Sequence, residues 1–380
     1  MKIDFTPKAR MLAAYRGEWC DRRPVAPEFW FYYPAKLLGV SMIEFEREVP
    51  FWQALQNAFR TFGCEGWGAT GPSIVRQGVE AASSLTKAGD GVWDETTEIV
   101  FRGKRFISRK SFSLGEPSWQ TKRIASDPRD FADAVEMVLG APFEVDSSYA
   151  VSAHAAVGED YLLEMSVGLP FTDFVADLMG FENAVLWFAD TPEEQIAALH
   201  ARYLAYQLEI TGRLLDTTPF ESYFVGCGYS CNSLFGPALW RRWDAPYIRE
   251  IARLVHGRGR LLHVHFHGRS IDCRGDFARL GIDCVCPFER APGGDVTTPA
   301  ELRMVREALD GRVTFNGNVH TVETLIRGTP ELVRAEVRQI NEAFAGSPRL
   351  IIGTGDQVGG ETPEDNLFAM IDEAKGCTVN

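Results

Sequence analysis

Residues 261–268 read Leu261-Leu262-His263-Val264-His265-Phe266-His267-Gly268, an alternation of apolar and histidine side chains. In a strand, successive side chains point to opposite faces, so the three histidines share one face and the apolar residues share the other. If the sheet closes into a barrel, the apolar face packs against the surrounding helices and the histidines point inward. The segment therefore predicts an inner barrel strand with titratable side chains.

Short apolar strands followed by helices recur on both sides of this segment. Strands are expected over residues 222–225, 260–267, 284–288, 313–318 and 350–354, and helices over 192–215, 237–256, 270–280, 299–309, 331–345 and 363–374. Proline near the first turn marks the start of many of these helices. Alternating strands and helices indicate an α/β protein with a parallel sheet. The number of units favours a single (β/α)8 TIM barrel, and no Gly-x-Gly-x-x-Gly turn follows an early strand to suggest a dinucleotide fold.

The first part of the chain departs from this rhythm. A short helix is expected over 6–16, an extended run over 23–31 and an amphipathic stretch over 49–62. Residues 74–113 look like a β-ribbon, with strands expected over 93–97, 99–101 and 106–108. No linker rich in Pro, Gly and Ser separates these parts. We therefore expect one domain over residues 1–380, with an N-terminal extension and a β-ribbon insertion.

Composition excludes several classes of protein. Apolar residues make up 45% and charged residues 24%, as in ordinary globular chains. With 39 basic and 52 acidic residues the net charge is -13, which disfavours nucleic acid and anionic membranes as partners. The first ten residues lack the apolar core of a signal peptide, and no long apolar run follows, so a cytoplasmic location is expected. The eight cysteines are too sparse for a disulfide scaffold.

The histidine strand is a candidate metal site. At about 3.3 Å per residue, His265 and His267 stand roughly 6.6 Å apart along the strand, whereas His263 and His267 are about 13 Å apart. One ion therefore binds at most two of them. His265 and His267 lie at the C-terminal end of the strand, where barrel enzymes place their chemistry, and His263 lies deeper in the core. Two imidazoles with a carboxylate or thiolate suit zinc. The alternative is a set of hydrogen-bonded interior histidines without metal.

A third ligand must come from another strand end. Asp356 is the first choice, because it follows the last clear strand between glycine-rich turns, although it could equally cap that loop. Glu289, after the strand ending near Phe288, is the second. Cys227 is the third, since the neighbouring glycines allow the backbone to approach a ligand closely.

Several short motifs in a fixed order resemble the uroporphyrinogen decarboxylase superfamily, which includes the zinc-dependent corrinoid methyltransferases. The motifs are Arg22-Arg23-Pro24-Val25, Val167-Gly168-Leu169-Pro170-Phe171, His265-Phe266-His267-Gly268, Gly281-Ile282-Asp283, Asn316-Gly317-Asn318-Val319, Gly328-Thr329-Pro330-Glu331, 351–356 and 362–366. The resemblance covers nearly the whole chain. It implies a single (β/α)8 barrel with its cleft at the C-terminal strand ends.

The decarboxylase branch fits poorly. Those enzymes carry arginines after the Arg-x-Pro-Val motif, which hold the carboxylates of the tetrapyrrole, whereas residues 26–34 here read APEFWFYYP. A polyanionic substrate needs cations rather than aromatics and an acid. Asp356 also stands where the decarboxylases have a C-terminal histidine. Porphyrin synthesis is therefore disfavoured.

The methyltransferase branch fits with two substitutions. Its zinc ligands are a His-x-Cys pair and a C-terminal Cys, and here His265 matches the first ligand while His267 and Asp356 replace the two cysteines. Two imidazoles and a carboxylate make a harder zinc site, suited to an oxygen or nitrogen ligand rather than to a thiol such as coenzyme M. No Asp-x-His-x-x-Gly motif occurs, so the resemblance implies that the corrinoid (cobalamin) is carried by a partner protein.

The expected function is zinc-dependent transfer of a methyl group from an O- or N-methylated small molecule to that corrinoid, with a methoxyaromatic donor favoured. The expected catalytic and metal residues are His265, His267 and Asp356, and the expected substrate-binding residues are Trp30, Tyr229, Cys227, Glu289, Asn318 and Gln357. Asp173 is expected on a loop over the cleft. A metal-free decarboxylase or lyase of a small carboxylic acid, in which His265 and Asp356 transfer protons, and a non-catalytic binding protein are the alternatives. A homodimer is left open.

Overall fold

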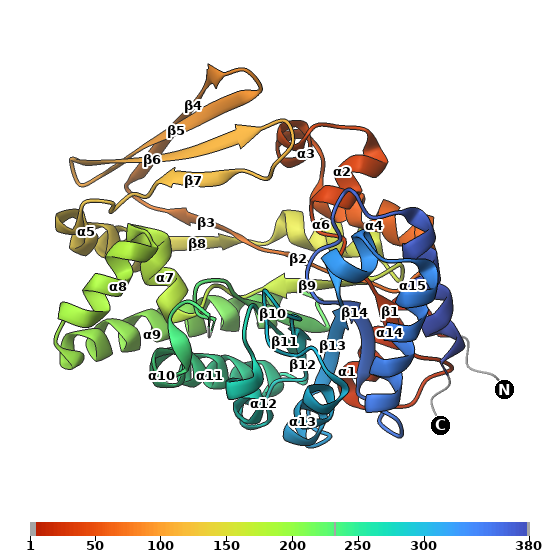
Figure 1. Cartoon of the computed structure of the whole chain (residues 1–380). Helices are drawn as coiled ribbons and strands as arrows, with labels where there is room; N and C mark the ends of the chain where they lie inside the picture. The colour runs from red at the N-terminus through yellow and green to blue at the C-terminus, as the bar shows by residue number, and fades with distance from the viewer. Residues whose placement is uncertain (1–4, 232, 378–380) are drawn as a thin grey trace.

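The core of the structure, a computed structural model describing residues 5–231 and 233–377, is a curled sheet of eight parallel strands (Figure 1). In spatial order these are β1 (Val25–Ala26), β14 (Leu350–Thr354), β13 (Thr314–Val319), β12 (Cys284–Pro287), β11 (Leu261–Phe266), β10 (Ser222–Cys227), β9 (Leu162–Ser166) and β2 (Trp67–Thr70). Every neighbouring pair is parallel. The expected α/β barrel and its five predicted strands are confirmed.

The two end strands of this sheet, β1 and β2, are joined by side chains. Among the described residues no backbone ladder links these strands. Instead the buried carboxylate of Glu65, just before β2, accepts a hydrogen bond from the backbone N–H of Val25 in β1 at 3.0 Å. The same carboxylate binds Arg22 at 2.6 Å and Arg10 at 3.0 Å. Glu65 therefore closes the barrel at this join.

Helices lie around the outside of the curled sheet (Figure 1). They are α1 (Pro7–Arg16), α5 (Phe131–Val135), α6 (Ser148–Val157), α7 (Phe171–Met179), α8 (Phe181–Asp190), α9 (Glu193–Thr217), α10 (Gly236–Leu239), α11 (Ala245–His256), α12 (Arg274–Leu280), α13 (Pro299–Leu309), α14 (Pro330–Ala343) and α15 (Glu364–Gly376). The single helix expected over 237–256 is interrupted by a π-helical turn at Trp240–Asp244 between α10 and α11. None of the described helices has both the length and the apolarity to span a membrane.

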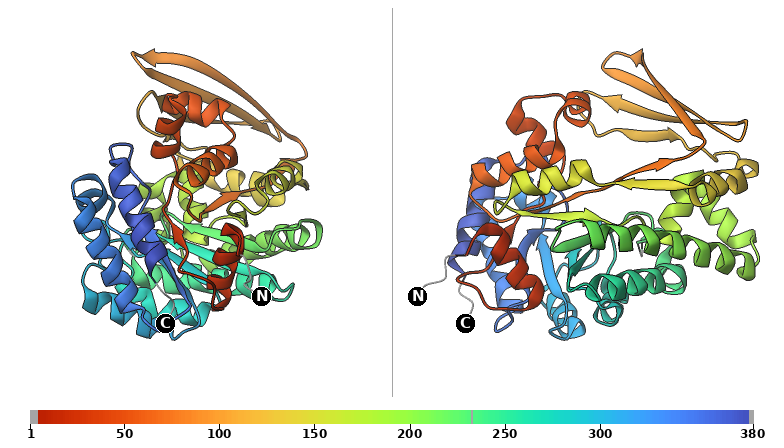
Figure 2. Two further views of the ribbon diagram at one scale, coloured as in Figure 1. Left: turned by 90° about the vertical axis from the view of Figure 1, so that its right-hand side faces the viewer. Right: turned by 180° about the vertical axis from the view of Figure 1, so that it is seen from behind.

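The N-terminal extension adds α2 (Tyr32–Leu38), α3 (Met42–Glu48) and α4 (Phe51–Phe62). A four-stranded antiparallel sheet follows, formed by β4 (Val79–Gly89), β5 (Val92–Phe101), β6 (Lys104–Ser113) and β7 (Trp119–Lys122). Figure 2 shows this sheet, in orange, standing off from the barrel beyond β3 (Ser73–Arg76) and β8 (Phe143–Asp146). This sheet is the expected β-ribbon.

Three details of the ribbon prediction were wrong. The strands expected over 93–97 and 99–101 are one continuous strand, β5, because Glu98 stays in the ladder opposite Ile107. The ribbon also extends to Lys122 rather than to residue 113. Finally, β3 pairs with β8 instead of joining the ribbon. Pairing between strands decides all three details, and a sequence pattern does not show it.

The predicted alternation in β11 is confirmed. Phe266 points outward, where its ring packs edge-on against Trp240 at 5.4 Å and Phe277 at 5.2 Å between ring centroids. His265 points inward, 5.8 Å from the ring of Trp67. The histidines of this strand therefore point into the interior of the barrel.

Candidate active site

A cavity of about 390 Å³ opens at the C-terminal ends of the barrel strands. Its lining is Glu28, Trp30, Phe31, Trp67, Leu169, Asp173, Phe224, Gly226, Cys227, Gly228, His265, His267, Asp356 and Gln357. These residues come from β2, β10, β11 and α7 and from the segments that follow β1, β9, β10, β11 and β14. Among the described residues no lysine or arginine lines the cavity, so this part of the chain offers it none of the fixed cations that a polycarboxylate would need.

His265 and His267 meet at the floor of this cavity. Their Nε2 atoms lie 2.6 Å apart. The other nitrogen of His267, Nδ1, lies 2.8 Å from Oε1 of Glu289, which also accepts the backbone N–H of Gly268 at 2.8 Å. Phe288, in the left-handed region with a φ of 56°, turns the chain after β12 just before Glu289. The two ring nitrogens therefore point to one place, and a carboxylate orients His267 from behind.

Three groups gather close enough to share a cation. His267, Glu289 and Asp356 each offer a donor atom, and these three atoms lie within 4.8 Å of one another. An imidazole with carboxylate oxygens is a donor set that zinc accepts, so these residues fit the ion that the family resemblance implies. The predicted ligands were His265, His267 and Asp356, whereas the group of three donor atoms contains His267, Asp356 and Glu289, the second choice from the sequence. His265 lies beside this group, with its Nε2 atom 2.6 Å from Nε2 of His267.

The electrostatic environment gives the two histidines opposite character. Burial lowers the pKa of His265 well below its usual value, and the charge of His267 lowers it further. Burial also lowers the pKa of His267, but its hydrogen bond to Glu289 and the charge of Asp356 outweigh that effect and raise it to about 9. Without metal at neutral pH, His265 is neutral and His267 is an imidazolium.

Glu28 is a site residue that sequence reasoning missed. It lies in the run after β1, is 7% exposed and lines the cavity. Burial, followed by the neighbouring charge of Asp356, raises its pKa to about 8, so the carboxyl holds a proton at neutral pH. Burial likewise raises the pKa of Asp356, although His267 opposes the shift. An acid amid the aromatic residues 26–34 was the sequence signal for Glu28.

An aromatic wall lines one side of the cavity. The ring centroids of Trp30 and Trp67 lie 5.2 Å apart, and those of Trp67 and Phe224 lie 5.5 Å apart. Trp30 was predicted to bind substrate and does line the cavity. Trp67 and Phe224 were missed, because a tryptophan or phenylalanine in a buried strand looks like any core residue. The wall offers flat apolar surface to an aromatic or methylated ligand.

Other predicted residues also reach the cavity. Cys227 lines it as a fully buried thiol, and burial raises its pKa well above the usual value. Gln357 lines it too, with its side-chain oxygen 3.4 Å from the backbone nitrogen of Phe31. Asp173 lines the cavity from the first turn of α7, not from the expected loop. Its carboxylate accepts the backbone N–H groups of Tyr229 and Ser230 at 2.6 and 2.9 Å, which fixes the loop after β10.

Three predicted substrate-binding residues lie outside the cavity lining: Glu289, which contacts His267 from behind, Asn318 and Tyr229. The side chain of Asn318 is fully buried, and its amide donates to the carbonyls of Phe288 and Val296 at 2.8 Å each. Tyr229 turns away and stacks on Phe181 with 5.6 Å between ring centroids. Asn318 and Tyr229 were expected at the cavity because both lie at or just after the C-terminal end of a strand. Hydrogen bonding of Asn318 and stacking of Tyr229 direct these side chains away from the cavity. His263 is fully buried, as expected.

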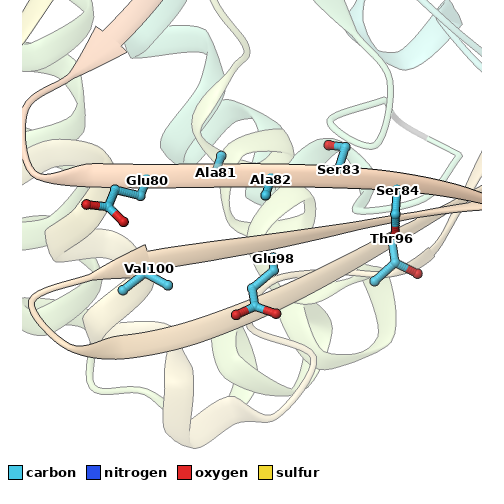
Figure 3. Close-up of a pocket in the computed structure, with 8 residues that line it drawn as sticks. All are labelled: Glu80, Ala81, Ala82, Ser83, Ser84, Thr96, Glu98 and Val100. Carbon is cyan, nitrogen blue, oxygen red and sulfur yellow. The ribbon is translucent and has the colours of Figure 1, made fainter.

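A second hollow lies on the ribbon, far in sequence from the histidines. Figure 3 shows its eight lining residues: Glu80, Ala81, Ala82, Ser83, Ser84, Thr96, Glu98 and Val100. Small side chains, hydroxyls and two glutamates form its walls, and its lining contains no histidine, cysteine or aromatic ring. The chemistry therefore belongs to the barrel cavity.

Comparison with known proteins agrees with this architecture. The family model described as uroporphyrinogen decarboxylase (URO-D) matches residues 152–377. Curated uroporphyrinogen decarboxylases of Burkholderia thailandensis and Burkholderia pseudomallei are 26% and 25% identical over 137 residues, which is 35% of this chain and 35% of each relative. The match thus spans about a third of the length of these relatives.

Among solved structures, a methyltransferase from Methanosarcina mazei superposes with a TM-score of 0.65. The superposition covers 98% of this chain and 99% of that one, at 17% identity. At this identity the likeness is one of fold. Since the family model matches more than half of the sequence, the chain belongs to the uroporphyrinogen decarboxylase family.

Proposed function

We propose that this protein is a methyltransferase that moves a methyl group from an O- or N-methylated small molecule to a cobalt(I) corrinoid carried by a partner protein. The observation that carries the proposal is the convergence of His267, Glu289 and Asp356, with His265 beside them, at the floor of an aromatic-walled cavity. We assign zinc to His265, His267 and Asp356, with Glu289 holding His267. Bound there, zinc would act as a Lewis acid on the heteroatom that bears the methyl group.

Other residues that line the cavity have separate roles in the proposed reaction. Trp30, Trp67 and Phe224 offer flat apolar surface, which favours a methoxyaromatic donor. Bound by its partner protein, a cobalt(I) corrinoid would supply the nucleophile that takes the methyl group, and the electron pair of the broken carbon–oxygen bond would stay on the donor oxygen. Glu28, which lines the cavity and whose pKa is raised to about 8 in the metal-free protein, would donate the proton that this oxygen needs.

The cavity supports a small donor rather than a tetrapyrrole. Its volume of about 390 Å³ suits a molecule of drug-like size or less. The two arginines of the N-terminal motif are committed elsewhere, since Arg22 binds Glu65 and Arg23 binds Asn341. The corrinoid-binding partner, as well as the cytoplasmic location, remains part of this proposal.

The experiment combines metal analysis with turnover. The protein is purified without chelator, its zinc content is measured, and a panel of methoxylated aromatics is assayed with cobalt(I) cobalamin by the absorbance of methylcobalamin. We expect about one zinc per chain and methyl transfer that is lost in His267→Ala. His256→Ala is the matched control, because His256 lies outside the cavity and pairs with Asp283. Zinc far below one per chain, or unchanged turnover in His267→Ala, would contradict the proposal.

A metal-free lyase or decarboxylase of a small acid is the second candidate. The observation that favours it is the pair formed by protonated Glu28 and cationic His267, which are suited to proton transfer without metal. The same experiment separates the two, because a lyase would release carbon dioxide or an alkene product from the zinc-free protein and would not need cobalamin.

A further inference from the structure

A line of buried polar side chains runs through the barrel behind the cavity. Glu164 on β9 accepts a hydrogen bond from Ser222 Oγ at 2.6 Å, and its other oxygen lies 2.8 Å from Nδ1 of His263. Nε2 of His263 lies 3.0 Å from Sγ of Cys286, and this sulfur lies 3.1 Å from Nδ1 of His265. Glu164, Ser222 and His263 are 0% exposed and Cys286 is 2% exposed. Apart from His265, none of them has a role in the chemistry proposed above.

One set of protonation states gives every hydrogen bond in the line a direction. If Glu164 is ionised it can only accept, so Nδ1 of His263 carries a proton, with the Tyr15 hydroxyl oxygen 3.1 Å away as a second acceptor. If His263 is also neutral, its Nε2 atom is bare and accepts the S–H of Cys286. A thiol has one proton, so toward His265 the sulfur only accepts, and Nδ1 of His265 must carry its proton. Nε2 of His265 is left bare.

The bare nitrogen of His265 is the one that faces the cavity. It lies 2.6 Å from Nε2 of His267. If Glu164 were protonated and donated to His263, every bond in the line would reverse, and Nε2 of His265 would carry a hydrogen. A nitrogen that carries a hydrogen has no lone pair to give to a cation. The direction of the hydrogen bonds in this line therefore decides which nitrogen of His265 carries the hydrogen.

We propose that Glu164 is a positioning residue for His265: acting through His263 and Cys286, it holds the tautomer whose Nε2 presents a lone pair to the cavity. This inference rests on the proposed function in one respect, the assignment of His265 as a zinc ligand. Groups behind a metal-binding histidine fix its tautomer and ring orientation in this way. Here the carboxylate of Glu164 contacts neither the cavity nor the proposed ligands, and it acts on His265 through the side chains of His263 and Cys286.

Tautomers can be read directly in the metal-free protein. Long-range proton–nitrogen NMR spectra of the full chain labelled with nitrogen-15 histidine distinguish a bare ring nitrogen from a protonated one. The His265 signals are assigned by their absence in His265→Gln. Near neutral pH we expect wild-type His265 as a single tautomer, with its proton on Nδ1 and its Nε2 bare.

Variants of the line test the cause. Cys286→Ser keeps one donor and one acceptor at the same position, whereas Cys286→Ala removes both. Cys273→Ala is the matched control, because Cys273 is also a fully buried thiol but lies outside both the line and the cavity lining. We expect the wild-type tautomer in Cys286→Ser and Cys273→Ala, and the opposite tautomer or a mixture in Cys286→Ala and in Glu164→Leu. By chelator competition, the zinc Kd should rise about 10-fold or more in the last two variants.

An unchanged His265 tautomer in Cys286→Ala or Glu164→Leu would overturn the inference, as would a wild-type His265 that carries its proton on Nε2. If Glu164→Leu does not fold, the comparison of Cys286→Ala with Cys286→Ser decides alone. Failure of the proposed function looks different: the wild-type protein would bind no zinc and transfer no methyl group, while the tautomers still followed Glu164 and Cys286.

Discussion

At the scale of single residues, the cavity depends on groups held in unusual protonation states. Glu28 keeps a proton at neutral pH because it is buried beside Asp356, and His267 keeps one because it binds Glu289. Both states follow from neighbours that belong to other strands. Each can therefore be tested by changing one side chain and measuring pH dependence or metal affinity.

Glu28→Gln should remove a loss of folding stability that the wild-type protein shows as the pH rises. The folded pKa of Glu28, about 8, exceeds the ordinary value of 4.5, so its contribution to stability is fully present below about pH 4.5 and is lost as the pH rises through 8. In the metal-free protein we expect equal melting temperatures for the variant and wild type near pH 4. Above pH 8 the variant should melt higher, by roughly 2 °C or more. Calorimetry at several pH values checks this; a difference that does not change with pH would contradict the raised pKa.

Glu289→Gln should weaken zinc binding without abolishing it. Glutamine keeps an acceptor oxygen for His267 and Gly268 but removes the charge that supports the imidazole, so we expect the zinc Kd to rise by about 10- to 100-fold. His267→Ala should remove measurable binding. Titration against a chromophoric chelator gives both values. Wild-type affinity in Glu289→Gln would show that His267 does not depend on this carboxylate.

At the scale of elements, the two faces of β11 have different roles, one in the stability of the fold and one in the site. Its outward side chains pack against helices, while its inward side chains form the site. The inward and the outward side chains can therefore be substituted separately. A change on the outward face should alter the free energy of unfolding and leave the donor atoms in place.

Phe266→Ala should be the clearest example. Phe266 is 1% exposed and packs against Trp240 and Phe277, so the variant should lose about 3–5 kcal/mol of unfolding free energy. Phe266→Leu should lose less, because much of the apolar volume remains. Urea denaturation followed by tryptophan fluorescence measures both. Equal stability of Phe266→Ala and wild type would mean that this face is not packed as described.

At the scale of the whole molecule, closure of the barrel depends on Glu65. Removing this carboxylate in Glu65→Ala takes one acceptor from Arg10, from Arg22 and from the Val25 N–H, and breaking a buried ion pair costs about 3–5 kcal/mol. The control is Glu209→Ala, which removes an exposed pair with Arg213 worth at most about 0.5 kcal/mol. Urea denaturation compares the two variants with wild type. Similar small losses in both would show that the join contributes little.

The sequence predicted the barrel well because its signals are local. The alternation in β11 and the proline-marked helix starts depend on neighbouring residues, and the structure confirms them. Hydrogen bonds between segments that are distant in the sequence leave no such local pattern. Asn318 and Tyr229 were misplaced for that reason, and the roles of Glu28 and Glu65 were missed, since burial beside Asp356 or contact with Val25 depends on strands that meet only after folding.

The join at Glu65 also has a consequence for the aromatic wall. Trp30 follows β1 and Trp67 begins β2, so two rings of the wall stand on opposite sides of that join. One buried carboxylate and its partners hold β1 to β2, whereas backbone ladders hold the other neighbouring strands together. Damage to this carboxylate would therefore reach the cavity through the spacing of these two tryptophans, while the ladders of the other strands stay whole.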